Sequence, residues 1–261
     1  MDLKIYQIDA FTNKLFGGNP AAVCPLKDWL SDELMQKIAA ENNLSETAYY
    51  IPKGDEFELR WFTPKAEVNL CGHATLATSY VIFEIEKSKQ AVLKFHTKSG
   101  VLTVSRAPKG YKMNFPADVF NKISVTKEMI NAIGEEPSEA YHGKNILMVV
   151  MNSEKELIGL APDPEKVKHL HRHGLIVTAE GENTDFVSRC FFPNLGINED
   201  PVTGSAHTIL TPYWSNRLQK NELSAFQLSE RKGEIFCKLV KDRVEISGEA
   251  VLYLEGRILI N

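Results

Sequence analysis

The sequence lacks a disulfide pattern, an excess of basic charge and a long apolar run. Its four cysteines are widely separated and include no C-x-x-C pair, so we expect a reducing compartment and no disulfide framework. The formal net charge of −4, without a basic stripe or tail, argues against a nucleic-acid partner. A strand begins at Leu3, which leaves no room for a signal peptide, and no apolar run approaches the length of a membrane span. The expected protein is therefore cytoplasmic and has no membrane partner.

Common catalytic signatures and metal-binding spacings are also missing. The sequence contains no Walker loop, dinucleotide-binding fingerprint, G-x-S-x-G elbow or H-E-x-x-H helix. Three histidines do lie close together, at His169, His171 and His173. On the helix expected from Pro164 onward, only His169 and His173 share a face, and no acidic residue or cysteine has a recognisable ligand spacing. We therefore predict no metal site, and none of these signatures calls for a cofactor.

Two segments of the chain match each other. The first runs from Arg60-Trp-Phe-Thr-Pro64 into Cys71-Gly72-His73-Ala74, and the second from Arg189-Cys-Phe-Phe-Pro193 into Thr203-Gly204-Ser205-Ala206. In each, an apolar strand ends at a proline four residues after an arginine, and a glycine then opens a run without charge. This repeat indicates an internal duplication.

The duplication predicts two halves with one strand-to-helix turn each. We place the halves at residues 1–117 and 118–261, and leave open whether the final strand returns to the N-terminal half. Two equivalent turns can face each other across a cleft and present two helix N-termini to one small anion. The active site is therefore expected in the cleft between the halves.

Two stretches without Asp, Glu, Lys or Arg, at residues 72–83 and 204–216, predict buried helices. A helix that is small or apolar on every side is enclosed by other elements. The second stretch contains Pro212, which is expected to end or kink its helix. Short strands separated by turn residues predict β-meanders at 93–115 and 234–260, with the last expected turn of the second near Gly256. Such a meander can wrap a buried helix.

Three further helices carry start or stop signals. Ser31 is a candidate N-cap, because two acidic residues and then an apolar stripe follow it. The segment Ser153-Glu-Lys-Glu156 has the pattern of a capping box. Gly134 is expected to close a helix at 126–133.

The densest polar cluster beside a buried helix is Asp200-Pro-Val-Thr-Gly-Ser-Ala-His207. Gly204 would let a substrate approach the backbone, and the N–H groups of residues 204–206 would point outward at the positive end of the helix dipole. A carboxylate or phosphate could bind there without an arginine. The alternative is an ordinary N-cap, in which Asp200 or Thr203 satisfies these N–H groups.

The first half offers the same geometry at Cys71-Gly72-His73-Ala74, where His73 is either a buried hydrogen-bonded residue or a catalyst. Glu46 follows a helix and lies at the mouth of a strand, between Leu44 and Ala48. An apolar pocket favours the protonated form of a carboxylate, which brings its pKa toward neutrality and suits it to proton transfer. The alternative for Glu46 is a surface glutamate at a strand edge.

Together these residues resemble the phenazine biosynthesis PhzF-like family, whose fold is that of diaminopimelate epimerase. The matching motifs follow the family's order across nearly the whole chain: Asp9-Ala-Phe-Thr12, Gly18-Asn-Pro-Ala-Ala-Val23, Leu44-Ser-Glu-Thr-Ala48, Arg60-Trp-Phe-Thr-Pro64, Cys71-Gly-His-Ala-Thr75, and Asp200-Pro-Val-Thr-Gly-Ser-Ala-His207 running into Pro212-Tyr-Trp214. The resemblance implies an α+β fold of two pseudo-symmetric halves, each a barrel-like mixed β-sheet around a central buried helix. It also implies a homodimer.

The resemblance further implies a reaction and residue roles. The enzyme that gives the family its name isomerises trans-2,3-dihydro-3-hydroxyanthranilate by proton transfer between carbons, without a cofactor or metal. By resemblance, Glu46 is the catalytic glutamate, His73 and Asp200 stabilise charge or orient polar groups, and the small substrate is held by its carboxylate. The expected substrate-binding residues are Gly72, Gly204, Ser205, Cys71 and Thr203.

Racemase relatives on this fold use two opposed cysteines, one at each helix start. Here Cys71 occupies one such position, but Thr203 stands at the other. An epimerase or dehydratase based on Cys71 is the alternative reaction, although we favour Cys71 as a small packing residue. A small-molecule-binding or regulatory protein without turnover is a further hypothesis, but a pure binder needs no proton shuttle such as Glu46 with His73.

Overall fold

The computed structural model describes residues 2–144, 146–171 and 173–260, and the chain divides into two compact units. The first unit comprises Met1–Asn114 and Ser247–Asn261, and the second comprises Phe115–Ile246. From the sequence, the division is expected after residue 117, and the place of the final strand is open. Within the described residues, no helix is both long enough and apolar enough to cross a membrane.

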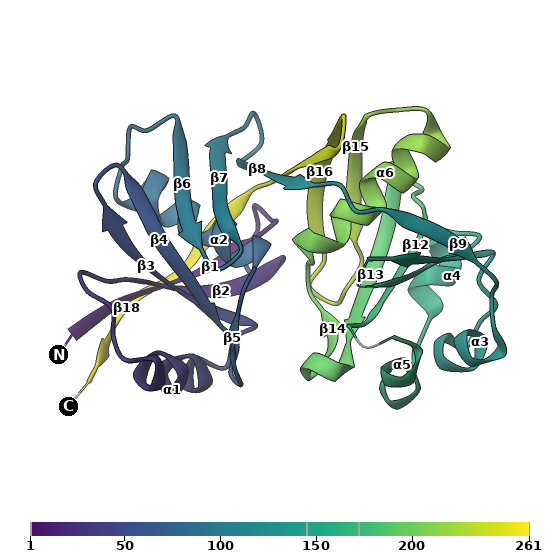
Figure 1. Ribbon diagram of the computed structural model, residues 1–261, viewed down its shortest axis with the longest axis horizontal. Coiled ribbons are helices and arrows are strands. Elements are labelled where there is room, and N and C mark those ends of the chain that lie inside the picture. Colours follow the sequence, from purple (N-terminus) through teal and green to yellow (C-terminus); the bar gives the residue numbers. More distant parts are fainter. Residues whose placement is uncertain (1, 145, 172, 261) are drawn as a thin grey trace. The chain divides into compact units, whose positions relative to one another are not determined.

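The first unit is built on a mixed sheet. Its pairing order is β18, β1, β2, β3, β4, β6 and β7, followed by β8 (Figure 1). The β2–β3 and β4–β6 pairs are parallel, and the other pairs in this order are antiparallel. The strands are β1 (Asp2–Ala10), β2 (Asn19–Pro25), β3 (Glu46–Lys53), β4 (Glu56–Phe62), β5 (Glu67–Val68), β6 (Val92–Thr97), β7 (Gly100–Arg106), β8 (Tyr111–Pro116) and β18 (Ala250–Leu259).

The second unit repeats this order of pairing. Strands β10, β11, β12, β13, β15 and β16 alternate antiparallel and parallel pairs just as β1, β2, β3, β4, β6 and β7 do, and the short β14 pairs with β13 as β5 does with β4. This shared order supports the internal duplication. The strands are β9 (Phe120–Ile123), β10 (Glu139–Gly143), β11 (Leu147–Val150), β12 (Leu175–Glu180), β13 (Phe186–Phe192), β14 (Ile197–Asp200), β15 (Glu222–Gln227), β16 (Gly233–Val240) and β17 (Arg243–Gly248).

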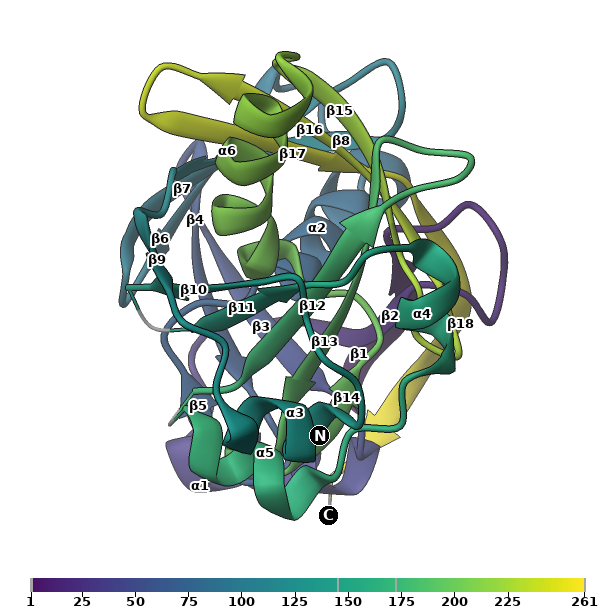
Figure 2. The same cartoon turned by 90° about the vertical axis from the view of Figure 1, so that its right-hand side faces the viewer.

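Each unit holds one buried helix, as the uncharged stretches predict. Helix α2 (Gly72–Tyr80) packs against β1, β2, β3 and β18, and continues as a π-helical turn over Val81–Ile85. In the second unit, a 3-10 turn (Gly204–Ala206) leads into helix α6 (His207–Leu218), which packs against β15 and β16 (Figure 2). The predicted α+β class, with a buried helix in each mixed sheet, is confirmed.

Of the two outcomes expected for Pro212, an end or a kink of its helix, the first does not occur. Helix α6 continues through Pro212 to Leu218. A proline cannot donate to the carbonyl four residues earlier, which here belongs to Thr208. The backbone N–H of Asp118 donates to this carbonyl instead, at 2.9 Å. The second unit thus supplies from another segment the hydrogen bond that the proline removes.

The shorter helices begin and end at most of the predicted signals. Ser31 caps α1 (Asp32–Asn42), Thr126 caps α3 (Lys127–Ile133), and Gly134 ends α3 with a positive φ. Ser153 caps α4 (Glu154–Gly159) by accepting from the Glu156 N–H, but the Glu156 carboxylate accepts from the N–H of Asn152, one residue before the position that a capping box requires.

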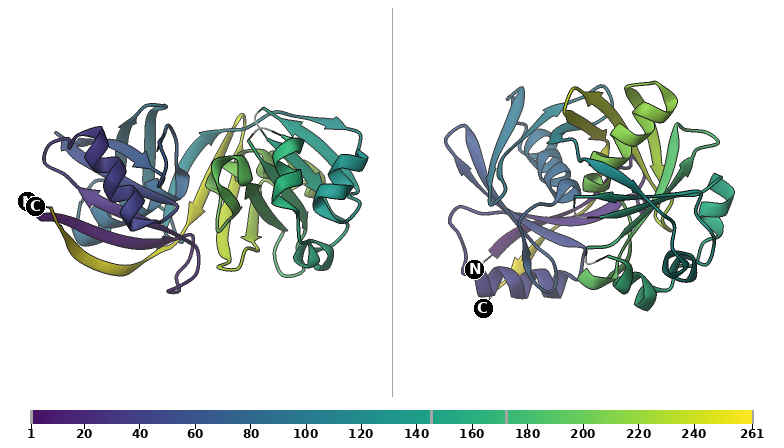
Figure 3. Two further views of the ribbon diagram at one scale, coloured as in Figure 1. Left: turned by 90° about the horizontal axis from the view of Figure 1, so that it is seen from below. Right: turned by 45° about the vertical axis from the view of Figure 1, so that its right-hand side comes forward.

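Two local predictions are wrong. Helix α5 (Pro164–Leu170) ends before His173, because the backbone is already extended at His171, so His169 and His173 share no helical face. Gly256 is not a turn but an interior residue of β18, paired with Ile5 of β1. Because β18 runs alongside β1 for its whole length, the first and last strands of the chain lie side by side (Figure 3).

An arginine fork fixes the segment ahead of each buried helix. Arg60 of β4 binds both carboxylate oxygens of Glu67, at 2.7 and 2.9 Å, and Arg189 of β13 binds both oxygens of Glu199, at 2.8 and 2.9 Å. Each guanidinium also lies 5.2 Å from the ring two residues further along its strand. Bidentate geometry of this kind is specific to arginine. The duplicated arginines therefore hold the short strands β5 and β14, which lead to the two helix starts.

We expect Arg189→Met to lower the free energy of unfolding by roughly 2–3 kcal/mol, because Glu199 loses its counter-charge and two backbone carbonyls at α4 lose a charged donor. Arg189→Lys should recover only part of this, since lysine cannot form the fork. Urea denaturation would measure both. Arg257→Met, which removes an exposed pair with Asp2, is the control and should cost less than about 0.5 kcal/mol. Equal losses for the two arginines would contradict a structural role for the fork.

Candidate active site

Glu46 is the first residue of β3 and is held by the neighbouring strand β2. Helix α1 ends at Asn43, whose left-handed backbone turns the chain toward β3. Glu46 then pairs with Ala21 of the parallel strand β2, while the buried residues that follow it in β3 fix the strand in the core. Its side chain is only 12% exposed. Glu46 is therefore a largely buried carboxylate and not a surface residue at a strand edge.

Cys71, Gly72 and His73 form the start of helix α2. Cys71 is the N-cap residue, with an extended backbone, and its side chain makes no capping hydrogen bond to the first turn. The helix has no acidic residue in this turn either. The positive end of its dipole is therefore offset by no carboxylate of its own. Gly72, as the first helical residue, adds no side chain over these N–H groups.

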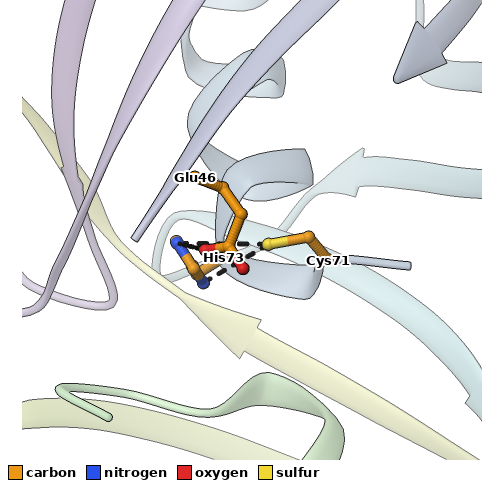
Figure 4. A group of neighbouring side chains, drawn as sticks. All are labelled: Glu46, Cys71 and His73. Carbon is orange, nitrogen blue, oxygen red and sulfur yellow. Dashed lines mark hydrogen bonds and ion pairs between the residues drawn. The ribbon is translucent and has the colours of Figure 1, made fainter. Parts of the chain in front are cut away.

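The structure brings Glu46, Cys71 and His73 together in the first unit (Figure 4). His73 Nε2 lies 3.0 Å from Glu46 Oε2. Cys71 Sγ lies near both ring nitrogens, 3.5 Å from His73 Nδ1 and 4.0 Å from Nε2, and the side-chain nitrogen of Asn19 lies 3.3 Å from Nδ1. The imidazole thus contacts both a carboxylate and a thiol, and its own side chain is only 6% exposed.

Electrostatics in this cluster favour a charged histidine and a neutral cysteine. Burial by itself would lower the pKa of His73, but the adjacent Cys71 and Glu46 outweigh it and raise this pKa well above its usual value. Burial and the charge of Glu46 raise the pKa of the Cys71 thiol to about 11, although His73 opposes this. At neutral pH, Cys71 is therefore a thiol, which is a poor base and a poor nucleophile.

Two of the predicted residues of the second half, Asp200 and Thr203, gather in the second unit around Gln227. Asp200 and Thr203 are buried, and the Thr203 hydroxyl donates to the Asp200 carboxylate. The buried Gln227 side chain accepts from the Thr203 N–H at 2.8 Å and donates to the Asp200 carbonyl at 2.8 Å. This network holds the ends of the turn between β14 and α6. The Thr203 side chain does not cap the turn that follows it.

The start of the second buried helix differs from the expectation. Residues 204–206 form a 3-10 turn, and α6 begins only at His207. The Ala206 N–H donates to the Thr203 carbonyl, so it does not point outward as predicted for all three N–H groups. His207 Nδ1 donates to the same carbonyl at 2.9 Å, which fixes the turn from the helix side.

Ser205 is the exposed residue of this turn and lines a cavity of about 270 Å³ in the second unit. Asp118 and His173 also line it, together with apolar side chains such as Phe192 and Ile209. A few polar groups in a mostly apolar hollow are typical of a small-molecule site. Ser205 is thus the predicted binding residue of this half with direct access to a cavity.

Sequence reasoning assigned no role to Asn19, Gln227 or His207. Asn19 and His207 lie inside two of the motifs that carry the family resemblance, so their positions could have marked them as candidates. No sequence signal marks Gln227, because its contact with Thr203 depends on the pairing of β15 with a strand distant in the sequence.

The chain is similar to known proteins over its whole length. Residues 8–256 match the family model for phenazine biosynthesis-like proteins, PhzC-PhzF. An uncharacterized isomerase of Pseudomonas aeruginosa is 48% identical, with 99% of each chain covered. A crystal structure of a PhzF-family phenazine biosynthesis protein from Enterococcus faecalis is 44% identical, with a TM-score of 0.97 and 100% of both chains covered. A structure of a predicted epimerase from Pseudomonas aeruginosa shares the fold alone, at 18% identity, with a TM-score of 0.75 over 99% of this chain and 100% of that one.

Proposed function

Because the chain belongs to the phenazine biosynthesis-like family, we propose that it is a cofactor-independent isomerase in which Glu46 moves a proton on a small carboxylate. The observation that carries this proposal is the buried contact of 3.0 Å between Glu46 and His73 beside the start of α2. Proton transfer between carbons needs one group that can both accept and return a proton, and a carboxylate can do both. The similarity to a protein named as an isomerase supports the reaction class.

In the proposed mechanism, Glu46 takes the proton from one substrate carbon and returns it to another. His73 orients the Glu46 carboxylate through Nε2, and its positive charge offsets negative charge that develops as the proton leaves. Removing a proton from carbon leaves charge on the substrate, so a fixed cation nearby lowers the barrier. Cys71 packs against the imidazole ring and transfers no proton.

We propose that the substrate carboxylate is recognised by helix-start amides. The first turn of α2 carries no side-chain cap and no acidic residue, so its N–H groups and dipole favour an anion. For Gly204, Ser205 and Asp200 of the second unit, the substrate-binding and orienting roles stay predictions from the sequence. A dihydro-hydroxyanthranilate and an amino acid both carry such a carboxylate. The proposed substrate class is therefore a small carboxylate.

The test is incorporation of solvent deuterium, read by mass spectrometry. The protein is incubated in heavy water with dihydro-hydroxyanthranilate, diaminopimelate, proline derivatives and other amino acids. Exchange at carbon in one compound would support the proposal. Tight binding of a panel member without exchange would instead favour the alternative of a binding or regulatory protein.

We expect Cys71→Ala to keep the exchange activity within about tenfold of the wild type. A thiol with a pKa of about 11 is protonated at neutral pH and cannot act as a general base there. The initial rate of deuterium uptake measures this. Loss of all exchange in Cys71→Ala, with the variant folded by circular dichroism, would move the reaction to a Cys71-based epimerase or dehydratase.

A further inference from the structure

We propose that the cluster of Glu46, Cys71 and His73 is also a binding site for a zinc ion, and that zinc inhibits the enzyme by occupying it. Among the described residues, this is the group of three His, Cys, Asp or Glu side chains whose ligand atoms lie within 4.8 Å of one another. The inhibitory part rests on the proposed role of Glu46. The binding part does not.

The donor set matches zinc chemistry. A thiolate, an imidazole and a carboxylate are the three side-chain ligands that zinc uses in proteins, and sites with three protein ligands leave a fourth position open. Calcium and magnesium prefer oxygen alone, so a sulfur and a nitrogen argue against them. The ligand chemistry therefore selects a thiophilic divalent cation.

The distances are close to those of a tetrahedral site. Zinc–ligand bonds of about 2.0–2.3 Å at tetrahedral angles place neighbouring donor atoms roughly 3.3–3.6 Å apart. In the cluster, His73 Nε2 lies 3.0 Å from Glu46 Oε2 and 4.0 Å from Cys71 Sγ. The third pair, Glu46 and Cys71, has donor atoms within 4.8 Å of each other, so side-chain rotations of up to about an ångström would bring all three donors onto one ion.

Charge and burial also favour the ion. Binding must displace the proton of the Cys71 thiol and the proton on His73 Nε2, after which the thiolate and the Glu46 carboxylate supply two negative charges that balance one divalent cation. All three side chains are largely buried, so little water competes for the metal. With Nε2 on the ion, Nδ1 would carry the proton, so the Asn19 amide beside it would have to turn its oxygen toward Nδ1 to accept that hydrogen bond. A bound ion would take the Glu46 lone pairs that the proposed reaction uses.

The binding test uses cobalt(II), the spectroscopic substitute for zinc, on the full chain without substrate. We expect one equivalent to bind and to give a sulfur-to-cobalt charge-transfer band in the near ultraviolet. The band should vanish in Cys71→Ser, and affinity should fall by at least roughly tenfold in Glu46→Gln. Competition with zinc should remove the band from the wild type.

The double variant His169→Gln/His173→Gln is the matched control, because it removes the other histidine group while leaving the cluster intact. It should bind cobalt as the wild type does. Absence of the band in the wild type, or a band that survives Cys71→Ser, would overturn the site whether or not the protein is an isomerase. If deuterium exchange is found, zinc should suppress it and a chelator should restore it. Exchange that continues at saturating zinc would overturn the inhibition.

Discussion

We expect Glu46→Gln to lower the rate of solvent deuterium exchange by a factor on the order of 10²–10⁴, because Glu46 is the proposed general base. Glutamine keeps the shape of the side chain and one carbonyl oxygen, so it can fill the same space beside His73. It has no lone pair basic enough to accept a proton from carbon. The exchange rate should therefore fall, while the affinity for the substrate should stay nearly the same. Isotope uptake measured at saturating substrate would give the rate, and calorimetry would give the affinity.

The matched control is Glu86→Gln. Glu86 is another carboxylate of the first unit that accepts a hydrogen bond from a buried residue, Tyr50, at 2.6 Å, but it lies outside the cluster. Its neutralisation should leave the exchange rate nearly unchanged. The proposed mechanism would be rejected if Glu46→Gln retained wild-type exchange, or if Glu86→Gln lost as much.

The sequence was informative about the site where the chemistry is local. The start of α2 could be identified from Cys71 to Ala74, because a glycine after a strand and a run without charge define a buried helix start. Glu46 and His73 could each be named as candidates. Their contact could not be derived, since it depends on the parallel pairing of β2 with β3 and on how α2 packs against both.

The errors have the same origin in long-range contacts. Pro212 is a helix breaker by its own chemistry, but the Asp118 N–H replaces the hydrogen bond that the proline removes. The prediction of no metal site rests on the histidine-rich segment, where spacing can be read along the chain, and it stays a prediction. The cluster of Glu46, Cys71 and His73 draws its ligands from separate elements, so no spacing rule could reveal it.

His207 should make the protein lose stability in mild acid. Its ring is fully buried, Nδ1 donates to Thr203, and Nε2 has no hydrogen-bond partner among the described residues. Burial therefore lowers the pKa of His207 from 6.5 to about 4, and the Thr203 hydrogen bond opposes this only in part. In the unfolded chain, the same ring takes up a proton near pH 6.5. Stability is thus fully present above pH 6.5 and is lost as the pH falls toward 4.

The loss should reach about 1.4 kcal/mol per pH unit within this window, or about 3 kcal/mol in all, because the unfolded state binds one more proton than the native state. Urea denaturation at pH 7.5, 6, 5 and 4.5 would measure the slope. His207→Gln keeps a donor for the Thr203 carbonyl but cannot titrate. Its unfolding should therefore take up one proton fewer, and its unfolding free energy should fall less steeply as the pH is lowered. Identical slopes would show that His207 is not a buried neutral ring. A shallower slope in the variant would show that the start of α6 is stable only while His207 is neutral. The turn that contains Ser205 would then depend on the same neutral ring.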